Sequence, residues 1–445
     1  MKLINKGKVS LMEKIRKTNA LQLYKEESSH QWEKREDLER DQLDKLKNLL
    51  EHGYKNVPYF RKVMEERGLS PDAITKLEDL AKFPLLNKEL IKEHKEDLHS
   101  ADMERYSPAE KRTGGSTGEP LRYYLPKVSH SMMWANIWRG WNVAGYTPGD
   151  KMAVLAGGSL LSGFDYKRQF YYYLNNWIPF SSYDMSQDKM KEYVEQLKSK
   201  NVQYMYAYSS AAYELANYIM ENKLDVDLKA VITTSEVLLP RYRQAIEEAF
   251  QCKVYDQYGA NDGGVTAFEC KEQNGLHINM ERCIVEIVDE EGNIVPDGEE
   301  GRILLTDLSN YAMPFIRYEV GDYGAVTKEP CPCGRGLIRL THIKGRQQEF
   351  IFTSQYGKVH GGFFSTTFRR YDEVDQFQVI QEVAGSVTVR LKINDSSFKV
   401  RSEELRKHIL EKAQLSEVAI EFTDAFEKTK GGKHKFVINK VSQEQ

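Results

Sequence analysis

Apolar residues recur at helical spacing through the first part of the chain. From about residue 11 to residue 99 the sequence is dense in Glu, Lys and Leu, and its apolar positions fall three and four residues apart. One such run comprises Leu43, Leu46, Leu49 and Leu50. This pattern predicts a helical N-terminal layer over about residues 1–100.

Beyond residue 150, short apolar runs typical of strands alternate with helical runs. Residues 151–155 and 230–234 have the character of buried strands, and residues 188–199 have helical spacing. Pro240 stands where a helix can begin, and residues 254–258 form the next strand-like run. The alternation predicts an α/β sheet with parallel strands. The glycine-rich residues 259–264 are then expected at the carboxyl end of the sheet, where open α/β folds bind ligands.

The last third of the chain has a different pattern. Residues 283–308 resemble a hairpin, with a turn at residues 289–293. After residue 346, strand-like runs surround a helical run at residues 403–412. We therefore predict a boundary near Gln348, with an N-terminal domain over residues 1–347 and a C-terminal domain over residues 348–445.

Composition limits the classes of function. The 445 residues are 40% hydrophobic and 29% charged, which is typical of globular chains with more than one domain. Lys and Arg total 63 against 66 Asp and Glu, so there is no basic field for nucleic acid. The beginning of the chain lacks the apolar core of a signal peptide, and no apolar run approaches the roughly 20 residues of a membrane span. We expect a cytoplasmic protein.

A loop of glycine and hydroxyl residues follows the predicted helical layer. Its candidate phosphate ligands are Thr113, Gly114, Gly115, Ser116, Thr117 and Gly118. Backbone N–H groups and hydroxyls in such a loop bind phosphate oxygens. The loop lacks the Gly-Lys-Ser/Thr of the common NTPases. Taken alone, it is equally well interpreted as a flexible surface loop.

The loop and four later segments resemble, in order, the signatures of the adenylate-forming superfamily. Residues 113–120 resemble its phosphate-binding loop, and residues 258–263 (Tyr-Gly-Ala-Asn-Asp-Gly) resemble Tyr-Gly-x-Thr/Ser-Glu-Gly. Residues 317–322 resemble Tyr-x-Thr-Gly-Asp, and residues 345–349 resemble Gly-Arg-x-Asp-Asp. Residues 428–433 resemble Pro-Lys-Thr-x-Ser-Gly-Lys. Five ordered matches are far more specific than any one of them.

Within that superfamily the chain is most similar to the phenylacetate-CoA ligase-like branch, including members found with capsular polysaccharide genes. The compact length, Thr-Thr-Ser-Glu at 233–236 and Cys-Pro-Cys-Gly-Arg at 331–335 carry this similarity. The resemblance implies an α/β fold with a large N-terminal adenylate-forming domain and a small C-terminal α+β domain joined by a hinge.

The resemblance also implies an activity. ATP and a carboxylic acid would form an acyl-adenylate with release of pyrophosphate, and the acyl group would then pass to coenzyme A. Two alternatives stay open: a ligase that passes the acyl group to an amine or a sugar hydroxyl, and a non-catalytic nucleotide- or acyl-binding protein. Asn261 and Asp262, which replace Thr and Glu, favour the last alternative, whereas Lys433 and Asp322 argue against it. A homodimer is also left open.

Each matched residue has a role by this resemblance. Loop residues 113–118 would hold the β- and γ-phosphates of ATP, and Asp262 would bind Mg²⁺, which takes oxygen ligands. Lys433 would enter the site during adenylation and offset charge at the α-phosphate. Tyr258 would stack on adenine, and Ser235 and Glu236 would border the base. Asp322 is assigned to the ribose hydroxyls, Arg346 to ribose or phosphate, and Gly259 to the nucleotide site as a whole. For Tyr258 alone, a core position is the alternative.

Three cysteines and a histidine have the spacing of a metal site. They are Cys270, His277, Cys331 and Cys333. Three thiolates and one imidazole would complete a tetrahedral zinc site without an open position, which is the structural type. The alternative is a set of reduced buried cysteines beside a surface histidine. Cys252 and Cys283 have no partner at ligand spacing and are expected in the core.

The sequence gives the least information about the pocket that would bind the carboxylic acid. Aromatic and small residues gather at residues 134–141, 156–159 and 204–213. Such runs are typical of packing as well as of recognition. They accommodate an aromatic or medium acyl group and identify none.

Overall fold

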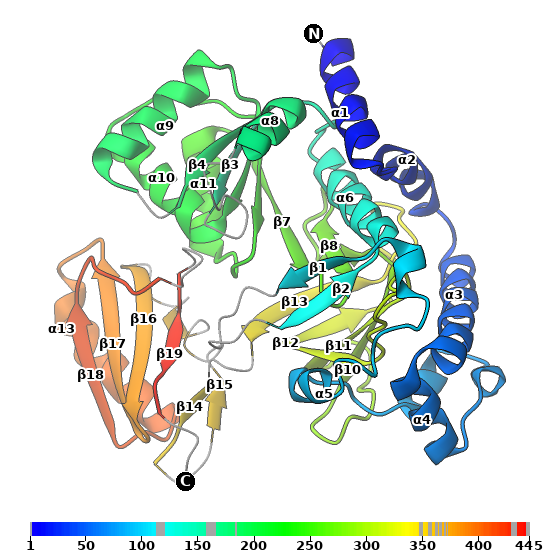
Figure 1. Cartoon of the computed structure of the whole chain (residues 1–445). Helices are drawn as coiled ribbons and strands as arrows, with labels where there is room; N and C mark the ends of the chain where they lie inside the picture. Colours follow the sequence, from blue (N-terminus) through cyan, green and yellow to red (C-terminus); the bar gives the residue numbers. More distant parts are fainter. Residues whose placement is uncertain are drawn as a thin grey trace.

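The structure is a computed structural model, and it describes residues 2–112, 121–156, 166–182, 185–346, 350–354, 358–360, 364, 367–368, 371, 373–428 and 434–441. A large lobe contains the N-terminal helices and a long sheet, and a smaller lobe contains the C-terminal strands (Figure 1).

Helices form the first layer of the large lobe, as the sequence predicts. They are α1 (Lys2–Arg16), α2 (Ala20–His30), α3 (Arg35–Asn56), α4 (Pro58–Arg67), η1 (Pro71–Ala73), η2 (Leu77–Lys82), α5 (Lys88–Glu93) and η3 (Met103–Tyr106). Leu46, Leu49 and Leu50 on α3 are fully buried, because their spacing places them on one helix face. A hairpin of β1 (Ala109–Arg112) and β2 (Arg122–Leu125) follows.

The central sheet begins with parallel strands. They are β3 (Met152–Ala156), β4 (Trp177–Ser181), β5 (Tyr204–Tyr208), β6 (Ala230–Thr234) and β7 (Lys253–Ala260), in the order β7-β6-β5-β3-β4. The accompanying helices are α6 (Lys127–Asn142), α8 (Tyr166–Asn175), α9 (Gln187–Ser199), α10 (Ser209–Glu221) and α11 (Pro240–Phe250). Pro240 occupies the first turn of α11, and β6 has the predicted bounds. The predicted parallel α/β unit is therefore present.

The sheet continues with antiparallel strands. They are β8 (Val265–Glu269), β9 (Leu276–Ile278), β10 (Cys283–Val288), β11 (Gly301–Asp307), β12 (Tyr318–Thr327) and β13 (Arg339–Arg346). The predicted glycine loop is shorter than expected, because Gly259 and Ala260 belong to β7 and pair with β8. The turn is confined to residues 261–264. Gly264 has φ +79° there, and a Cβ atom on it would lie 2.5 Å from Cγ of Asp307, so only glycine fits.

The C-terminal lobe is an α+β unit, as predicted. Its elements are β14 (Phe350–Phe352), β15 (Lys358–His360), β16 (Val374–Val383), β17 (Ser386–Ile393), α13 (Phe398–Lys412), β18 (Glu417–Phe422) and β19 (Val437–Asn439). Four strands form a sheet in the order β18-β17-β16-β19, and β14 pairs with β15. The boundary near Gln348 stays a prediction.

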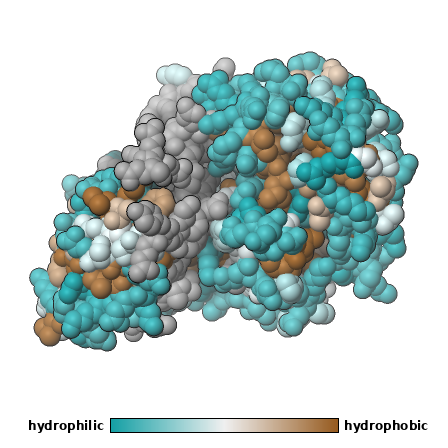
Figure 2. Space-filling view, turned by 90° about the horizontal axis from the view of Figure 1, so that it is seen from below, coloured by the Kyte–Doolittle hydropathy of each residue, from teal (hydrophilic) through white to brown (hydrophobic). Residues whose placement is uncertain are grey.

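Hydrophilic residues predominate on the face of the molecule seen in Figure 2. They cover most of both lobes there, and hydrophobic residues form smaller groups among them. Among the described helices, none has the length and apolar character that crossing a membrane requires.

A buried acid lies where α2 packs on α6. Glu27 is 3% exposed, and neither of its carboxylate oxygens has a hydrogen-bond partner among the described residues. Arg139 donates to the backbone oxygen of Glu27 (3.1 Å) and to the carboxylate of Glu281 instead. Burial raises the pKa of Glu27 to about 8.

This acid predicts a pH dependence of stability. The unfolded carboxyl group loses its proton near its ordinary pKa of 4.5, whereas the folded one keeps it until about pH 8. Stability is therefore full below pH 4.5 and is lost as the pH rises toward 8. Glu27→Gln should flatten this fall, measured as the free energy of unfolding from pH 5 to pH 8. Parallel curves for the variant and the wild type would show that Glu27 ionises normally.

Candidate functional site

The candidate site lies at the carboxyl edge of the parallel strands. Ser182 follows β4, Ser209 follows β5, Glu236 comes two residues after β6, and Asp262 comes two residues after β7. Because these strands are parallel, their carboxyl ends meet at one edge of the sheet, which is where ligands bind in open α/β folds.

Two reciprocal hydrogen bonds join the segments around residues 258–262 and 318–322. The hydroxyl of Tyr258 donates to Oδ2 of Asp322 (2.6 Å), and the hydroxyl of Tyr318 donates to Oδ2 of Asp262 (2.9 Å). Asp322 is 8% exposed, and Tyr318 is fully buried. Tyr258 is half-buried, with its hydroxyl fixed on the carboxylate of Asp322. The structure thus brings together Tyr258, Asp262 and Asp322.

Asp322 also lies opposite Arg346 in the sheet. The two residues are register partners on β12 and β13. Gly321, immediately before Asp322, has φ +91°. The side chain of Arg346 lies outside the described residues, so the structure places its backbone only.

A buried ion pair supports the turn at residues 261–264. Arg282 donates to Oδ2 of Asp307 (2.7 Å), and both side chains are fully buried. Arg282 also reaches Oδ1 of Asn261 (3.4 Å), and Asn261 donates to the hydroxyl of Tyr123 (3.5 Å). Burial raises the pKa of Tyr123, so this hydroxyl stays protonated. The sequence interpretation missed Arg282 and Asp307, because no local spacing relates them to Asn261.

Glu236 makes contacts in both lobes. Its Oε2 accepts the backbone N–H of Ser210 (2.8 Å), in the first turn of α10. Its Oε1 accepts the backbone N–H of His434 (3.0 Å), in the C-terminal lobe. Ser235, next to it, is exposed and has φ +68°.

Two other hydrogen bonds hold the C-terminal lobe against the same edge. The ammonium of Lys428 donates to the backbone oxygen of Ser182 (3.3 Å). The hydroxyl of Tyr213, on α10, donates to Oδ1 of Asp375 on β16 (3.0 Å). In this arrangement the lobe covers the ends of the parallel strands.

The remaining predicted nucleotide residues are not placed by the structure. The loop at residues 113–120, with Thr113, Gly114, Gly115, Ser116, Thr117 and Gly118, lies outside the described residues, and so does Lys433. Gly259 is exposed on β7, next to Tyr258.

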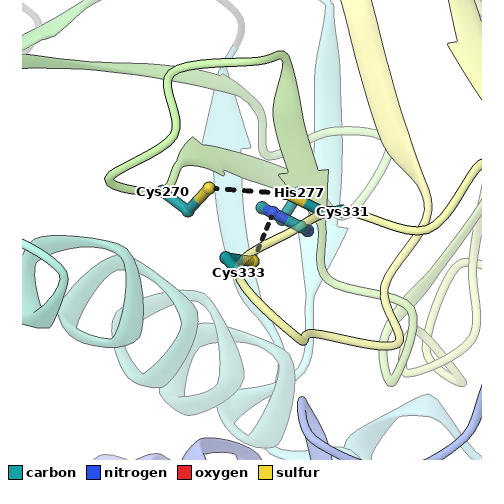
Figure 3. A group of neighbouring side chains, drawn as sticks. All are labelled: Cys270, His277, Cys331 and Cys333. Atoms are coloured by element: carbon teal, nitrogen blue, oxygen red, sulfur yellow. Dashed lines mark hydrogen bonds between the residues drawn. The ribbon is translucent and has the colours of Figure 1, made fainter.

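The predicted metal ligands do lie together. Cys270 follows β8, His277 is on β9, and Cys331 and Cys333 lie in the connection from β12 to β13. Their four ligand atoms are within 4.8 Å of one another, and three of the residues are buried (Figure 3). The sulfurs of Cys270 and Cys331 are 3.7 Å apart, and Sγ of Cys333 is 3.4 Å from Nε2 of His277.

These spacings fit the edges of a zinc tetrahedron. Zinc–sulfur bonds of about 2.3 Å and zinc–nitrogen bonds of about 2.0 Å give sulfur–sulfur edges of about 3.8 Å and sulfur–nitrogen edges of about 3.5 Å. Burial lowers the pKa of His277 to about 3, so the imidazole is neutral, the form that binds metals.

Of the two cysteines expected in the core, Cys283 is buried and Cys252 is half-buried.

The loop that carries two of these cysteines is fixed to the N-terminal helices. Arg335 donates to Oε1 of Gln31 (2.7 Å), and the backbone N–H of Gly336 donates to the backbone oxygen of Gln31 (3.0 Å). Arg335 also lies 4.5 Å over the ring of Trp32. The loop that carries Cys331 and Cys333 therefore joins the sheet to the segment between α2 and α3.

Known proteins with similar sequences fall into two groups. Protein CapK of Staphylococcus aureus is 24% identical over 395 residues, which cover 87% of this chain and 86% of CapK. A phenylacetate-coenzyme A ligase of Pseudomonas putida is 28% identical over 324 residues, which cover 71% of this chain and 72% of that enzyme. Residues 351–440 match the family model described as the CapK C-terminal domain.

A solved structure with the same fold is that of 2-hydroxyisobutyryl-CoA ligase. In the postadenylation state, in complex with R3-HIB-AMP, it matches with a TM-score of 0.72 at 20% identity, over 90% of this chain and 89% of that chain. The same enzyme with 2-HIB-AMP and CoA in the thioesterification state gives a TM-score of 0.59 over the same shares of both chains. The predicted adenylate-forming fold and the predicted resemblance are confirmed, and the chain superposes better on the postadenylation structure than on the thioesterification structure.

Proposed function

We propose that this chain, whose fold and relatives are those of adenylate-forming acid-CoA ligases, activates a carboxylic acid with ATP and transfers the acyl group to coenzyme A. The observation that carries the proposal is the pair of reciprocal bonds from Tyr258 to Asp322 and from Tyr318 to Asp262. They hold two carboxylates from separate segments at one edge, in a fold that matches an adenylate-bound ligase.

In the first step a carboxylate oxygen of the acid attacks the α-phosphorus of ATP. The new oxygen–phosphorus bond gives the acyl-adenylate, and the bond to the β-phosphate breaks, so pyrophosphate leaves. Asp322 would accept hydrogen bonds from the ribose hydroxyls, and Arg346 on the adjacent strand would donate to ribose or phosphate oxygens. Tyr258 and Glu236 would border the adenine, and the loop at residues 113–118 would hold the β- and γ-phosphates.

Asp262 is proposed as the protein ligand of Mg²⁺. It is half-buried, and the Tyr318 hydroxyl bonds only one of its carboxylate oxygens, Oδ2. One carboxylate together with the phosphates of a nucleotide is a common way of holding this ion, so the residue fits. The ion would supply charge neutralisation for the phosphates. Asp is shorter than the family's Glu, and the hydroxyl of Tyr318 fixes its direction.

In the second step the thiol of coenzyme A attacks the acyl carbon and displaces AMP. The C-terminal lobe would first rotate, since the postadenylation and thioesterification states of 2-hydroxyisobutyryl-CoA ligase match this chain with different TM-scores. An amine or a sugar hydroxyl is retained as a second acceptor class, because the resemblance to members found with capsular polysaccharide genes leaves it open.

The cluster of Cys270, His277, Cys331 and Cys333 is proposed as a structural zinc site. Its sulfur and nitrogen spacings suit tetrahedral coordination, and its four protein ligands leave no position for a substrate. Its role would be to tie the end of β8 to the β12–β13 connection.

Asp322 offers a test of the nucleotide site. Asp322→Ala removes a charged acceptor for the ribose hydroxyls, and bonds of this kind contribute about 1.5–3 kcal/mol. ATP binding should weaken by about one to two orders of magnitude in calorimetry. Asp289→Ala, an aspartate in the turn after β10, serves as the control and should bind ATP normally. If Asp322→Ala also binds ATP normally, the nucleotide site is elsewhere.

The proposed function is tested by pyrophosphate release. Purified protein, ATP and Mg²⁺ are incubated with a panel of aromatic and medium-chain carboxylic acids, and then with coenzyme A, amino sugars or amino acids as acceptors. Acid-dependent release, with acyl-CoA as the product, is the expected result. An acylated amine or sugar would assign the second acceptor class. ATP binding without release over the whole panel would favour a non-catalytic binding protein.

A further inference from the structure

We propose that Glu236 is a positioning residue that couples closure of the C-terminal lobe to adenylation. Its carboxylate accepts one backbone N–H from each lobe, and the one from the C-terminal lobe belongs to the residue that directly follows Lys433 in the chain. This inference rests on the proposed function, and it gives Glu236 a role beyond bordering the adenine.

The two oxygens of Glu236 have separate partners. Oε2 accepts from Ser210 in the first turn of α10, a helix of 13 residues, where a negative charge is stabilised by the free N–H groups and the helix dipole. This bond keeps the carboxylate at the carboxyl edge of the sheet. Oε1 is then directed to the N–H of His434, 198 residues away in sequence.

His434 is itself anchored to the C-terminal lobe. The residue is 8% exposed, and its Nε2 lies 2.9 Å from the backbone oxygen of Phe377 on β16. Burial lowers the pKa of His434 to about 4, so the ring is neutral and Nε2 can donate to that oxygen. An isolated antiparallel β-bridge between the backbones of Lys428 and His434 also holds His434. The His434 backbone N–H is therefore tied to β16 and to Lys428 in this lobe.

A carboxylate suits this position better than an amide. Ser210 and His434 are both N–H donors to it, and a carboxylate offers two acceptor oxygens. Glutamine would offer one oxygen and would turn its NH₂ group toward the other donor. Glu236→Gln should therefore lose one of the two bonds, although its size is almost unchanged.

The bond to His434 belongs to one arrangement of the lobes. This chain superposes better on the postadenylation structure of 2-hydroxyisobutyryl-CoA ligase than on its thioesterification structure, with TM-scores of 0.72 and 0.59. A bond between the lobes stabilises only the arrangement in which it forms. Loss of this bond should slow adenylation and leave the rate of acyl transfer nearly unchanged.

The experiment measures both half-reactions in Glu236→Gln and Glu236→Ala. Acid-dependent pyrophosphate release reports adenylation, and chemically made acyl-adenylate with coenzyme A reports transfer. The kcat of adenylation should fall about ten- to a hundredfold, as for a lost charge-assisted bond, with a smaller change in the KM for ATP and with the rate of transfer within about threefold of wild type.

Asp375→Ala is the matched control. Asp375 is also a carboxylate in a bond between the lobes, to the hydroxyl of Tyr213, but it lies on β16, away from Lys433 in sequence. Adenylation should fall less in this variant than in Glu236→Gln, and transfer should stay within about threefold of wild type, because the lost bond does not hold the residue next to Lys433. Thermal unfolding establishes that each variant is folded, and Glu236→Gln is the reference if the alanine variant is not.

The outcomes separate this inference from the proposed function. Absence of pyrophosphate release by the wild type counts against the proposed function. With an active wild type, equal losses in both half-reactions of Glu236→Gln, a raised KM for ATP as its main effect, or an equal adenylation defect in Asp375→Ala would overturn the role assigned to Glu236.

Discussion

Replacing Lys433 by alanine is expected to slow acyl-adenylate formation by on the order of 100-fold or more. The ammonium would offset negative charge that builds at the α-phosphate as the carboxylate attacks, and this interaction is made mainly in the transition state. Lys433 itself lies outside the described residues, but the next residue, His434, is bonded to Glu236 at the carboxyl edge. The proposed role requires the lobe arrangement described above.

The same variant should leave acyl transfer nearly intact. Chemically made acyl-adenylate and coenzyme A bypass the first step, so the rate of acyl-CoA formation isolates the second. Lys435→Ala, two residues further along, is the control and should retain both half-reactions. If Lys433→Ala fails equally in both assays, the lysine serves the fold or both steps, and the assignment of alternating lobe orientations is wrong.

Loss of the metal cluster is expected to have the largest effect on stability. Cys331→Ser or Cys333→Ser would remove a ligand of the proposed zinc ion and leave the other thiols in a largely buried position without a metal. Metal binding free energy is folding free energy in such sites, so the melting temperature should fall by on the order of 10 °C or more. The wild type should carry about one zinc per chain, because one tetrahedral site needs four ligands.

Elemental analysis of protein prepared without chelator measures the zinc content, and calorimetry measures the melting temperature. Cys252→Ala, outside the cluster, should keep the zinc and lose little stability. If the wild-type protein contains no metal, the proposed zinc site is wrong. A cysteine variant that melts as the wild type but accepts different acids would contradict the structural role.

Features encoded over short stretches of sequence were predictable. Three examples are the apolar run of β6, the proline that begins α11 and the spacing of leucines on α3. Each indicates a local structure that the folded chain also has. The cysteine cluster was also predictable, although Cys270 and Cys331 are 61 residues apart, because few arrangements satisfy three thiols and one imidazole.

Contacts between distant segments were not predictable in the same way. The bonds from Tyr258 to Asp322 and from Glu236 to His434 join residues 64 and 198 positions apart. Their geometry depends on how strands and lobes pack, which no local pattern records. The prediction for residues 259–264 was wrong in part for a related reason. The glycines of this segment indicated a loop, but pairing with β8 extends β7 through Ala260.

The acyl-adenylate itself is tested most directly with an isotope. An accepted carboxylic acid labelled with ¹⁸O in both carboxylate oxygens is turned over with ATP, Mg²⁺ and coenzyme A, and the products are analysed by mass spectrometry. Attack by the carboxylate on the α-phosphorus, followed by transfer of the acyl group, leaves one labelled oxygen in AMP, and this is the predicted result. Label in inorganic phosphate with ADP as the nucleotide product, or AMP without label, would contradict the account.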